Sequence, residues 1–141
     1  MAAAPCGDRR SRPISPTSWR SSATSSIKKL LYAHHADVVL NGHDHVYARS
    51  APMDPLGNAD PRNGIREFVI GTGGEGLDTV VPTTPNLEAW ADQYYGTMKL
   101  TLRPGGYHWD YESALESPTA PSGTPASYSD TGSASCHSGG E

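Results

Sequence analysis

Charged residues and large apolar side chains are both scarce in this chain of 141 residues. Only 18% of the residues are charged, against about 25% in globular domains, and 35% are hydrophobic, which is below the globular average. Gly and Pro are plentiful, at 15 and 12 residues, so we expect part of the chain to remain unpacked. The length allows one domain. The net charge of -4 gives no electrostatic reason to expect nucleic acid or an anionic membrane as a partner.

Long hydrophobic runs are absent. No apolar run approaches the roughly 20 residues that a membrane helix needs, and the N-terminal 22 residues contain no apolar core of a secretory signal. Cysteine is also rare, with Cys6 near one end and Cys136 near the other. These two residues are compatible with one disulfide or with two free thiols, so the cellular compartment stays open.

Composition divides the chain into three zones. Residues 1–23 are rich in Arg, Ser and Pro and show no hydrophobic period, so we expect a disordered or out-of-context segment. Residues 24–112 carry all the periodic signal and are predicted to form a partial domain. Residues 113–141 are mainly small and polar, which predicts a flexible tail rich in Ser, Gly and Pro.

The middle zone begins with a predicted helix and a predicted strand. The helix is expected within 24–35, after a Ser or Thr N-cap. Four residues with helical spacing form a stripe along one face of this helix: Ile27, Leu30, Leu31 and His34. The run "ADVVLNG" at 36–42 is short and continuously apolar, a pattern typical of a strand covered on both faces.

The rest of the middle zone is predicted to form loops and strands. Residues 50–64 are dense in Pro, Asn, Asp and Gly and predict a long surface loop, and 65–74 predict a strand. The two prolines in 79–93 favour a loop with one helical turn at its end. Residues 94–104 and 107–113 alternate and predict a hairpin. This order indicates part of an α/β sandwich, mostly β strands with one short helix. Its valines and leucines need a partner layer that the chain barely supplies.

Two histidines stand directly after the first predicted strand. His43 and His45 follow Gly42, with Asp44 between them. In an extended segment such a pair lies on one face, about 6–7 Å apart. Imidazole is the commonest protein ligand for transition metals, and open α/β sheets bind ligands beyond the carboxyl ends of their strands. The pattern therefore allows a metal site, but by spacing alone such histidines more often cap loops or lie in solvent without a ligand.

The surrounding sequence makes the motif more specific. "ADVVLNGHDHVYARSAP" resembles the last metal-binding motif, Gly-His-x-His, of the calcineurin-like metallophosphoesterases, and most resembles their purple acid phosphatase branch. "GIREFVIGTGGEGL" is similar to the strand and glycine loop of that branch, and "YGTMKLTLRPGGYHWDY" to its closing hairpin. "SDTGSASCH" is similar to the ending of many bacterial members. The resemblance runs from about residue 24 to the end of the chain, with an unmatched part in the tail.

The resemblance implies a fold and a chemistry. The chain would be the C-terminal part of a four-layer α/β sandwich. His43 and His45 would each bind one ion of a binuclear Fe, Zn or Mn centre that hydrolyses a phosphate ester by in-line attack. Asp44 occupies a variable position and receives no role. No catalytic residue is assigned, and the residues that bind substrate are not identified.

The residues after the motif fit the branch in part. Tyr47 and Arg49 match positions that we expect to be mainly structural. Ala48, between them, stands where the branch often has Glu.

The other ligand motifs of the family are not found in residues 1–41. These are an Asp-x-His, a Gly-Asp with a bridging partner, a Gly-Asn-His and a further His. The chain therefore supplies two ligands, and two imidazoles cannot hold two cations. Two interpretations remain open. The chain is a fragment of a metal-dependent phosphoesterase that needs a missing N-terminal half, or it is a catalytically silent incomplete domain.

Other motifs are weaker. "GTGGEG" at 71–76 spells a dinucleotide-binding pattern, but the prolines that follow argue against the helix that such a site needs. His108 alternates with aromatic residues and is expected to pack, and His137 is not expected to bind a metal. Three acidic residues have no partner that spacing can define: Asp78, Asp92 and Asp110.

Overall fold

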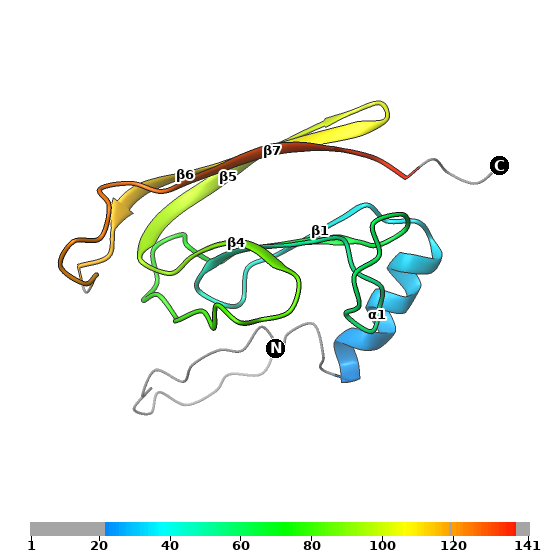
Figure 1. Cartoon of the computed structure of the whole chain (residues 1–141), viewed down its shortest axis with the longest axis horizontal. Coiled ribbons are helices and arrows are strands. Elements are labelled where there is room, and N and C mark those ends of the chain that lie inside the picture. The colour runs from blue at the N-terminus through cyan, green and yellow to red at the C-terminus, as the bar shows by residue number, and fades with distance from the viewer. Residues whose placement is uncertain (1–21, 119, 138–141) are drawn as a thin grey trace.

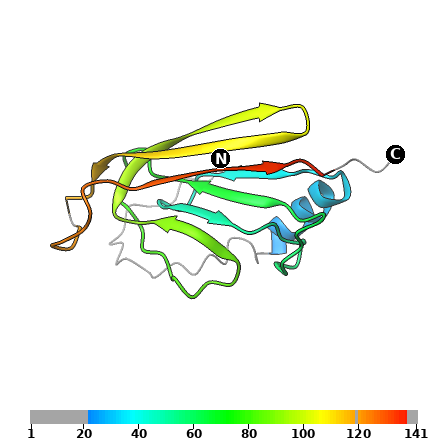
Figure 2. The same cartoon turned by 45° about the horizontal axis from the view of Figure 1, so that its top comes forward.

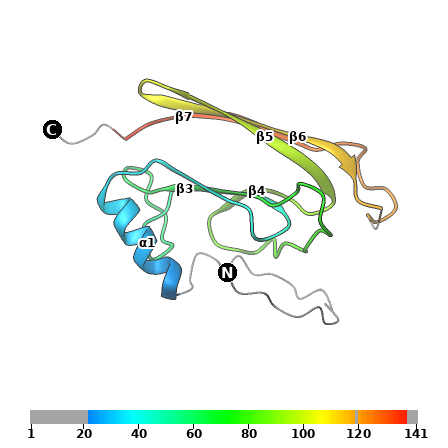
Figure 3. The same cartoon turned by 180° about the vertical axis from the view of Figure 1, so that it is seen from behind.

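Two β-sheets packed face to face make up most of the structure. The computed structural model describes residues 22–118 and 120–137. In these residues it contains α1 (Ser22–Ala33), β1 (Val38–Asn41), β2 (Tyr47–Ser50), β3 (Arg66–Ile70), β4 (Leu87–Ala91), β5 (Tyr94–Arg103), β6 (Gly106–Glu116) and β7 (Ser129–Ser135). One sheet has the order β1-β3-β2-β4 and the other β5-β6-β7. Helix α1 lies on the face of the first sheet that is turned away from the second (Figure 1, Figure 3). The prediction of mostly β strands with one short helix is confirmed and fits part of an α/β domain.

The register of the four-stranded sheet decides where the histidine motif lies. β1 and β3 are parallel, with Asn41 opposite Val69, so their carboxyl ends meet at one edge. β2 runs antiparallel to β3 and starts at the same edge, with Tyr47 opposite Ile70. The turn between β1 and β2, which contains the motif, therefore lies at the carboxyl edge of β1 and β3.

The predicted hairpin is confirmed. β5 and β6 pair antiparallel along their whole length, and Arg103 pairs with Gly106 across the turn (Figure 2). Gly105 takes a φ of 79° there, a left-handed conformation that glycine adopts without strain. The alternation of apolar and polar residues in both strands made this element predictable.

The prediction of a flexible tail is wrong for its second part. β7 pairs with β6 from Gly106 opposite Ser135 to Glu112 opposite Ser129. Its residues are small because the neighbouring strand carries large rings. A Cβ added at Gly132 would stand 2.3 Å from the Trp109 ring. β7 thus completes the sheet through backbone pairing and contributes little apolar surface of its own.

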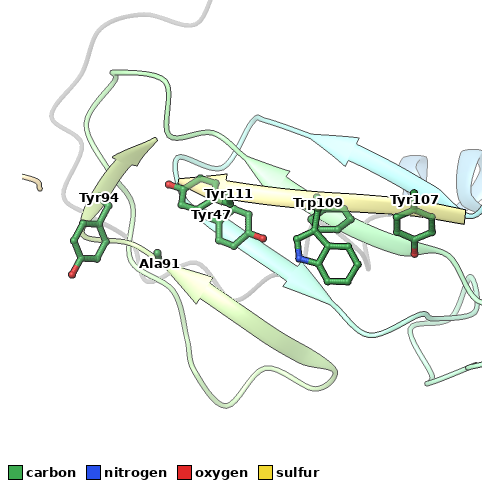
Figure 4. Close-up of a cluster of buried hydrophobic side chains, with 7 residues drawn as sticks. Tyr47, Ala91, Tyr94, Tyr107, Trp109 and Tyr111 are labelled. Carbon is green, nitrogen blue, oxygen red and sulfur yellow. The ribbon is translucent and has the colours of Figure 1, made fainter. Parts of the chain in front are cut away.

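Aromatic residues form the layer between the two sheets. The buried cluster consists of Tyr47, Phe68, Ala91, Tyr94, Tyr107, Trp109 and Tyr111 (Figure 4). The rings of Tyr47 and Tyr111 stack with centroids 3.9 Å apart. The expectation that the chain barely supplies a partner layer is therefore wrong for this face. That expectation rested on valines and leucines, whereas tyrosine and tryptophan side chains fill the space between the two sheets.

The opposite face of the first sheet is less completely covered. α1 contacts it through Leu31 and Tyr32, which pack against a small cluster around Met53. Ile27 and Leu30, from the predicted apolar stripe, are each 61% exposed. The helix itself is confirmed, but most of that stripe faces outward. No helix in the described part of the chain is long and apolar enough to cross a membrane.

Three strand predictions need correction. β1 forms, but it is an edge strand and its Leu40 is 51% exposed, so it is not covered on both faces. β2 was not predicted. β4 replaces the expected loop and helical turn. Pro82 and Pro85 precede that strand, and Asn86, with a φ of 63°, turns the chain into it. β4 is also an edge strand, where sheet pairing tolerates nearby prolines best.

Candidate metal-ligand site

His43 and His45 lie in the turn between β1 and β2, as the sequence predicts for their position. The backbone there is bent and not extended, because the Val46 amide donates a 2.9 Å hydrogen bond to the carbonyl of Asp44. His43 and His45 therefore do not share one face of an extended strand. His43 is exposed and His45 is half-buried. The two imidazoles thus occupy different environments.

A loop from the end of β3 folds back over His45. The His45 ring atom Nδ1 lies 2.8 Å from the carbonyl oxygen of Gly76. The His45 backbone amide donates to Asp78 Oδ2 at 3.0 Å, and the Asp78 amide donates back to the His45 carbonyl at 3.1 Å. Asp78 is 33 residues from His45, so sequence spacing could not reveal this pairing.

Gly71 explains why the loop can approach so closely. A Cβ at this position would stand 1.9 Å from the carbonyl oxygen of Asp44, which no side chain tolerates. The Gly71 amide also donates to the Val46 carbonyl at 3.0 Å. The first glycine of "GTGGEG" is thus required by the contact with the histidine motif. No helix follows the loop, so the geometry of a dinucleotide site is absent from this segment.

An acid and a base are buried beneath the motif. Glu67 on β3 accepts a hydrogen bond from the side-chain amide of Asn41, which immediately precedes Gly42. Lys28 on α1 is only 3% exposed. Burial lowers its pKa to about 8, although Glu67 acts in the opposite direction. Burial likewise raises the pKa of Glu67. This pair was not predicted from the sequence, because a lysine in an amphipathic helix is ordinarily a surface residue.

The residues that follow the motif hold the two sheets together. The Tyr47 hydroxyl and Arg49 Nε both donate to Asp130 Oδ2, at 2.6 and 2.7 Å. Trp109 Nε1 donates to the same oxygen at 3.2 Å, and the Arg49 guanidinium lies 4.9 Å from the Trp109 ring centroid. Burial would raise the pKa of Asp130, but these hydrogen bonds outweigh it and hold the pKa below its usual value. Burial and the bond to Asp130 raise the pKa of Tyr47. These contacts agree with a structural role for Tyr47 and Arg49.

The remaining candidates contact groups outside the motif. His108 Nδ1 lies 3.0 Å from Ser133 Oγ. The His137 amide donates to Asp37 Oδ1 at 2.6 Å. Asp92 Oδ2 accepts from a backbone amide at 2.9 Å. Cys136 is a free thiol, and Cys6 lies outside the described residues.

The two histidines do not complete a metal site by themselves. Among the described residues, no three His, Cys, Asp or Glu side chains lie close enough together to hold an ion. In the part of the chain that the structure describes, open cavities of about 450 and 600 Å³ are lined by neither His43 nor His45. The second cavity includes Thr72, Gly73 and Gly74 of the glycine-rich loop. The donor set of the described residues therefore does not by itself fit a binuclear centre.

Comparison with known proteins gives one partial similarity. The chain is 32% identical over 84 residues to a protein from Arabidopsis thaliana named "Probable inactive purple acid phosphatase 1". The matched region is 54% of this chain and only 14% of that protein. No family model matches the chain, and no solved structure matches it. This partial similarity hints at the phosphoesterase family.

Proposed function

We propose that this chain is the part of a metal-dependent phosphoesterase, of the purple acid phosphatase kind, that carries the last ligand motif. His43 and His45 would each contribute one imidazole to a binuclear centre of Fe, Zn or Mn. The other ligands would come from a complementing N-terminal polypeptide. The whole assembly would hydrolyse phosphate esters, and this chain alone would be silent. The fold would be the C-terminal part of the four-layer metallophosphoesterase sandwich.

The observation that carries this proposal is the position of the motif. Gly42 to His45 lie at the carboxyl edge of two parallel strands, where open α/β sheets bind their ligands. Nδ1 of His45 contacts the Gly76 carbonyl, and the half-buried ring remains partly exposed at that edge. The partial similarity to a protein named as a purple acid phosphatase supports the same assignment.

The silent alternative has its own support. The described residues contain no cluster of ligands that could hold an ion. The similar Arabidopsis protein is itself named "probable inactive". The two interpretations differ in what happens when the missing ligands are supplied, and two experiments address them.

The first experiment measures metal content per chain after dialysis against a weak chelator. We expect near-zero bound metal and no hydrolysis of p-nitrophenyl phosphate by this chain alone. Two tightly held ions per chain would show that the site is complete and would overturn the proposed division of ligands.

The second experiment transfers residues 37–49 into the matching place of an active purple acid phosphatase. The chimera should keep bound metal and activity, and His43→Ala or His45→Ala should each remove one ion and most of the activity. Asp44→Ala is the matched control and should keep both. A folded chimera that binds no metal would favour the silent interpretation.

A further inference from the structure

The loop after β3 makes two kinds of contact with His45, and together they define the state of its ring. One contact is to the side chain, from Nδ1 to the carbonyl oxygen of Gly76 at 2.8 Å. The others are to the backbone and close a two-way pairing with Asp78 at 3.0 and 3.1 Å. Both kinds come from residues 76–78. The loop is brought there by Gly71, which fits against Asp44 only because it lacks a side chain.

The Gly76 contact specifies which ring nitrogen carries the proton. A carbonyl oxygen only accepts hydrogen bonds, so Nδ1 of His45 must be the donor. A neutral imidazole has one N–H and one lone pair. Its lone pair therefore lies on Nε2, the nitrogen that the loop leaves without a bond. In metalloproteins, a hydrogen bond of this kind on the other nitrogen orients a ligating histidine.

Asp78 acts on the same ring through the backbone. Its carboxylate and its amide both bind the main chain of His45, so they fix the position from which the ring extends. Gly76 lies two residues before Asp78. Because Asp78 is fixed to the His45 backbone, it also places the Gly76 carbonyl that the ring contacts. The Asp78 side chain is half-buried, which shields this pairing partly from water.

We propose that Asp78 is a positioning residue that holds His45 in its Nδ1–H tautomer, which leaves the lone pair on Nε2. The use of that atom by a metal ion rests on the function proposed above. The tautomer itself does not, since it is set within this chain and exists without any metal. Among the described residues, no equivalent hydrogen bonds to His43 are found, and His43 is exposed. The loop after β3 therefore fixes His45 and not His43.

The test is nitrogen-15 NMR of the histidine rings in the metal-free chain at pH 8, where imidazole is mostly neutral. We expect the proton of His45 on Nδ1. Asp78→Ala should release the ring into a mixture of tautomers and speed hydrogen exchange of the His45 amide by about tenfold, the loss expected for one hydrogen bond. Asp78→Asn keeps an acceptor oxygen and should restore the single tautomer.

Glu75→Ala is the matched control. It removes a carboxylate from the same loop, but Glu75 is exposed and makes none of the contacts to His45 described above. It should leave both readouts unchanged. A proton on Nε2 in the unaltered chain would overturn the proposal, even if Asp78→Ala failed to fold. Equal behaviour of Asp78→Ala and Glu75→Ala would also overturn it. Either result would leave the proposed phosphoesterase function untouched, because no metal enters the measurement.

Discussion

The two faces of the four-stranded sheet are built in different ways. The face toward β5–β7 is packed with aromatic rings, and the polar tips of Tyr47 and Trp109 both bind one carboxylate, that of Asp130. The face toward α1 buries few side chains and leaves Ile27 and Leu30 largely in water. One side of this sheet is therefore covered by the chain itself. The other side retains exposed apolar surface and a buried acid and base.

The largest effect should follow from removing a ring between the sheets. Phe68 on the inner strand β3 is fully buried, and its ring centroid lies 5.5 Å from that of Trp109. Phe68→Ala should lower the free energy of unfolding by about 3–5 kcal/mol, because it removes apolar contact and leaves a cavity. Urea unfolding followed by tryptophan fluorescence measures it.

Leu102→Ala is the control for that substitution. Leu102 is 73% exposed on β5, and its loss should change the free energy of unfolding by less than about 0.5 kcal/mol. If the two substitutions had equal effects, the layer between the sheets would not be the core of this protein.

The second effect concerns the carboxylate that joins the sheets. Asp130→Ala removes the acceptor for Tyr47, Arg49 and Trp109, and leaves these donors without it. We expect a loss of about 2–3 kcal/mol, the range for hydrogen bonds to charged groups. Thermal unfolding by circular dichroism would detect it, and Glu112→Ala at an exposed position of β6 should be nearly neutral.

The same carboxylate predicts an acid dependence. The pKa of Asp130 is lowered in the folded chain, so the unfolded chain binds a proton more readily. The contribution of Asp130 is therefore present above its usual pKa of 3.8 and is lost as the pH falls through the lower, folded value. Asp130→Ala should unfold with a weaker dependence on pH below 4. An unchanged dependence would show that Asp130 does not supply it.

The sequence predicted the elements whose signal is local. The helix over 24–35 and the hairpin β5–β6 have their own periodicity and turn residues, and both formed. β4 and β7 were missed because their strand character comes from pairing with β2 and β6. β7 in particular needs small residues to fit beside Trp109. Small polar residues in a sequence predict a flexible tail, so the strand was missed.

The candidate site divides in the same way. The position of His43 and His45 followed from the predicted strand run at 36–42, and the observed strand β1 ends one residue earlier, at Asn41. Their support could not be predicted, because Asp78 is 33 residues away and is brought back by a glycine loop. Lys28 was likewise missed, since its burial depends on how α1 lies on the sheet.

The fourth prediction concerns the face toward α1. Burial lowers the pKa of Lys28 from 10.5 to about 8, so between these values the unfolded chain binds the extra proton. The free energy of unfolding should therefore rise with pH in this window, by about 1–2 kcal/mol from pH 7.5 to 9.5. The raised pKa of the Cys136 thiol acts in the opposite direction above about pH 9, and the raised pKa of Tyr47 does so above about pH 10. Urea unfolding at the two pH values measures the slope.

Substitution assigns that slope to its residue. Lys28→Met should abolish it, whereas Lys29→Met, at an exposed position of the same helix, should retain it. At neutral pH, Lys28→Met also leaves Glu67 without its opposite charge, so adding Glu67→Gln should recover part of the lost stability. If the slope persisted in Lys28→Met, Lys28 would not be its source, and the buried acid and base would not distinguish the two faces of the sheet.

The smallest effect on stability is expected at the exposed stripe of α1. Ile27→Gln with Leu30→Gln should change the free energy of unfolding by less than about 0.5 kcal/mol each, since both side chains are 61% exposed. The same change should reduce self-association, measured by sedimentation velocity, because neighbouring exposed apolar side chains favour contact between molecules. Leu31→Gln on the inner side of the helix should destabilise the chain instead. Equal stability loss at Leu30 and Leu31 would mean that α1 buries both sides, and the contrast between the two faces of the sheet would disappear.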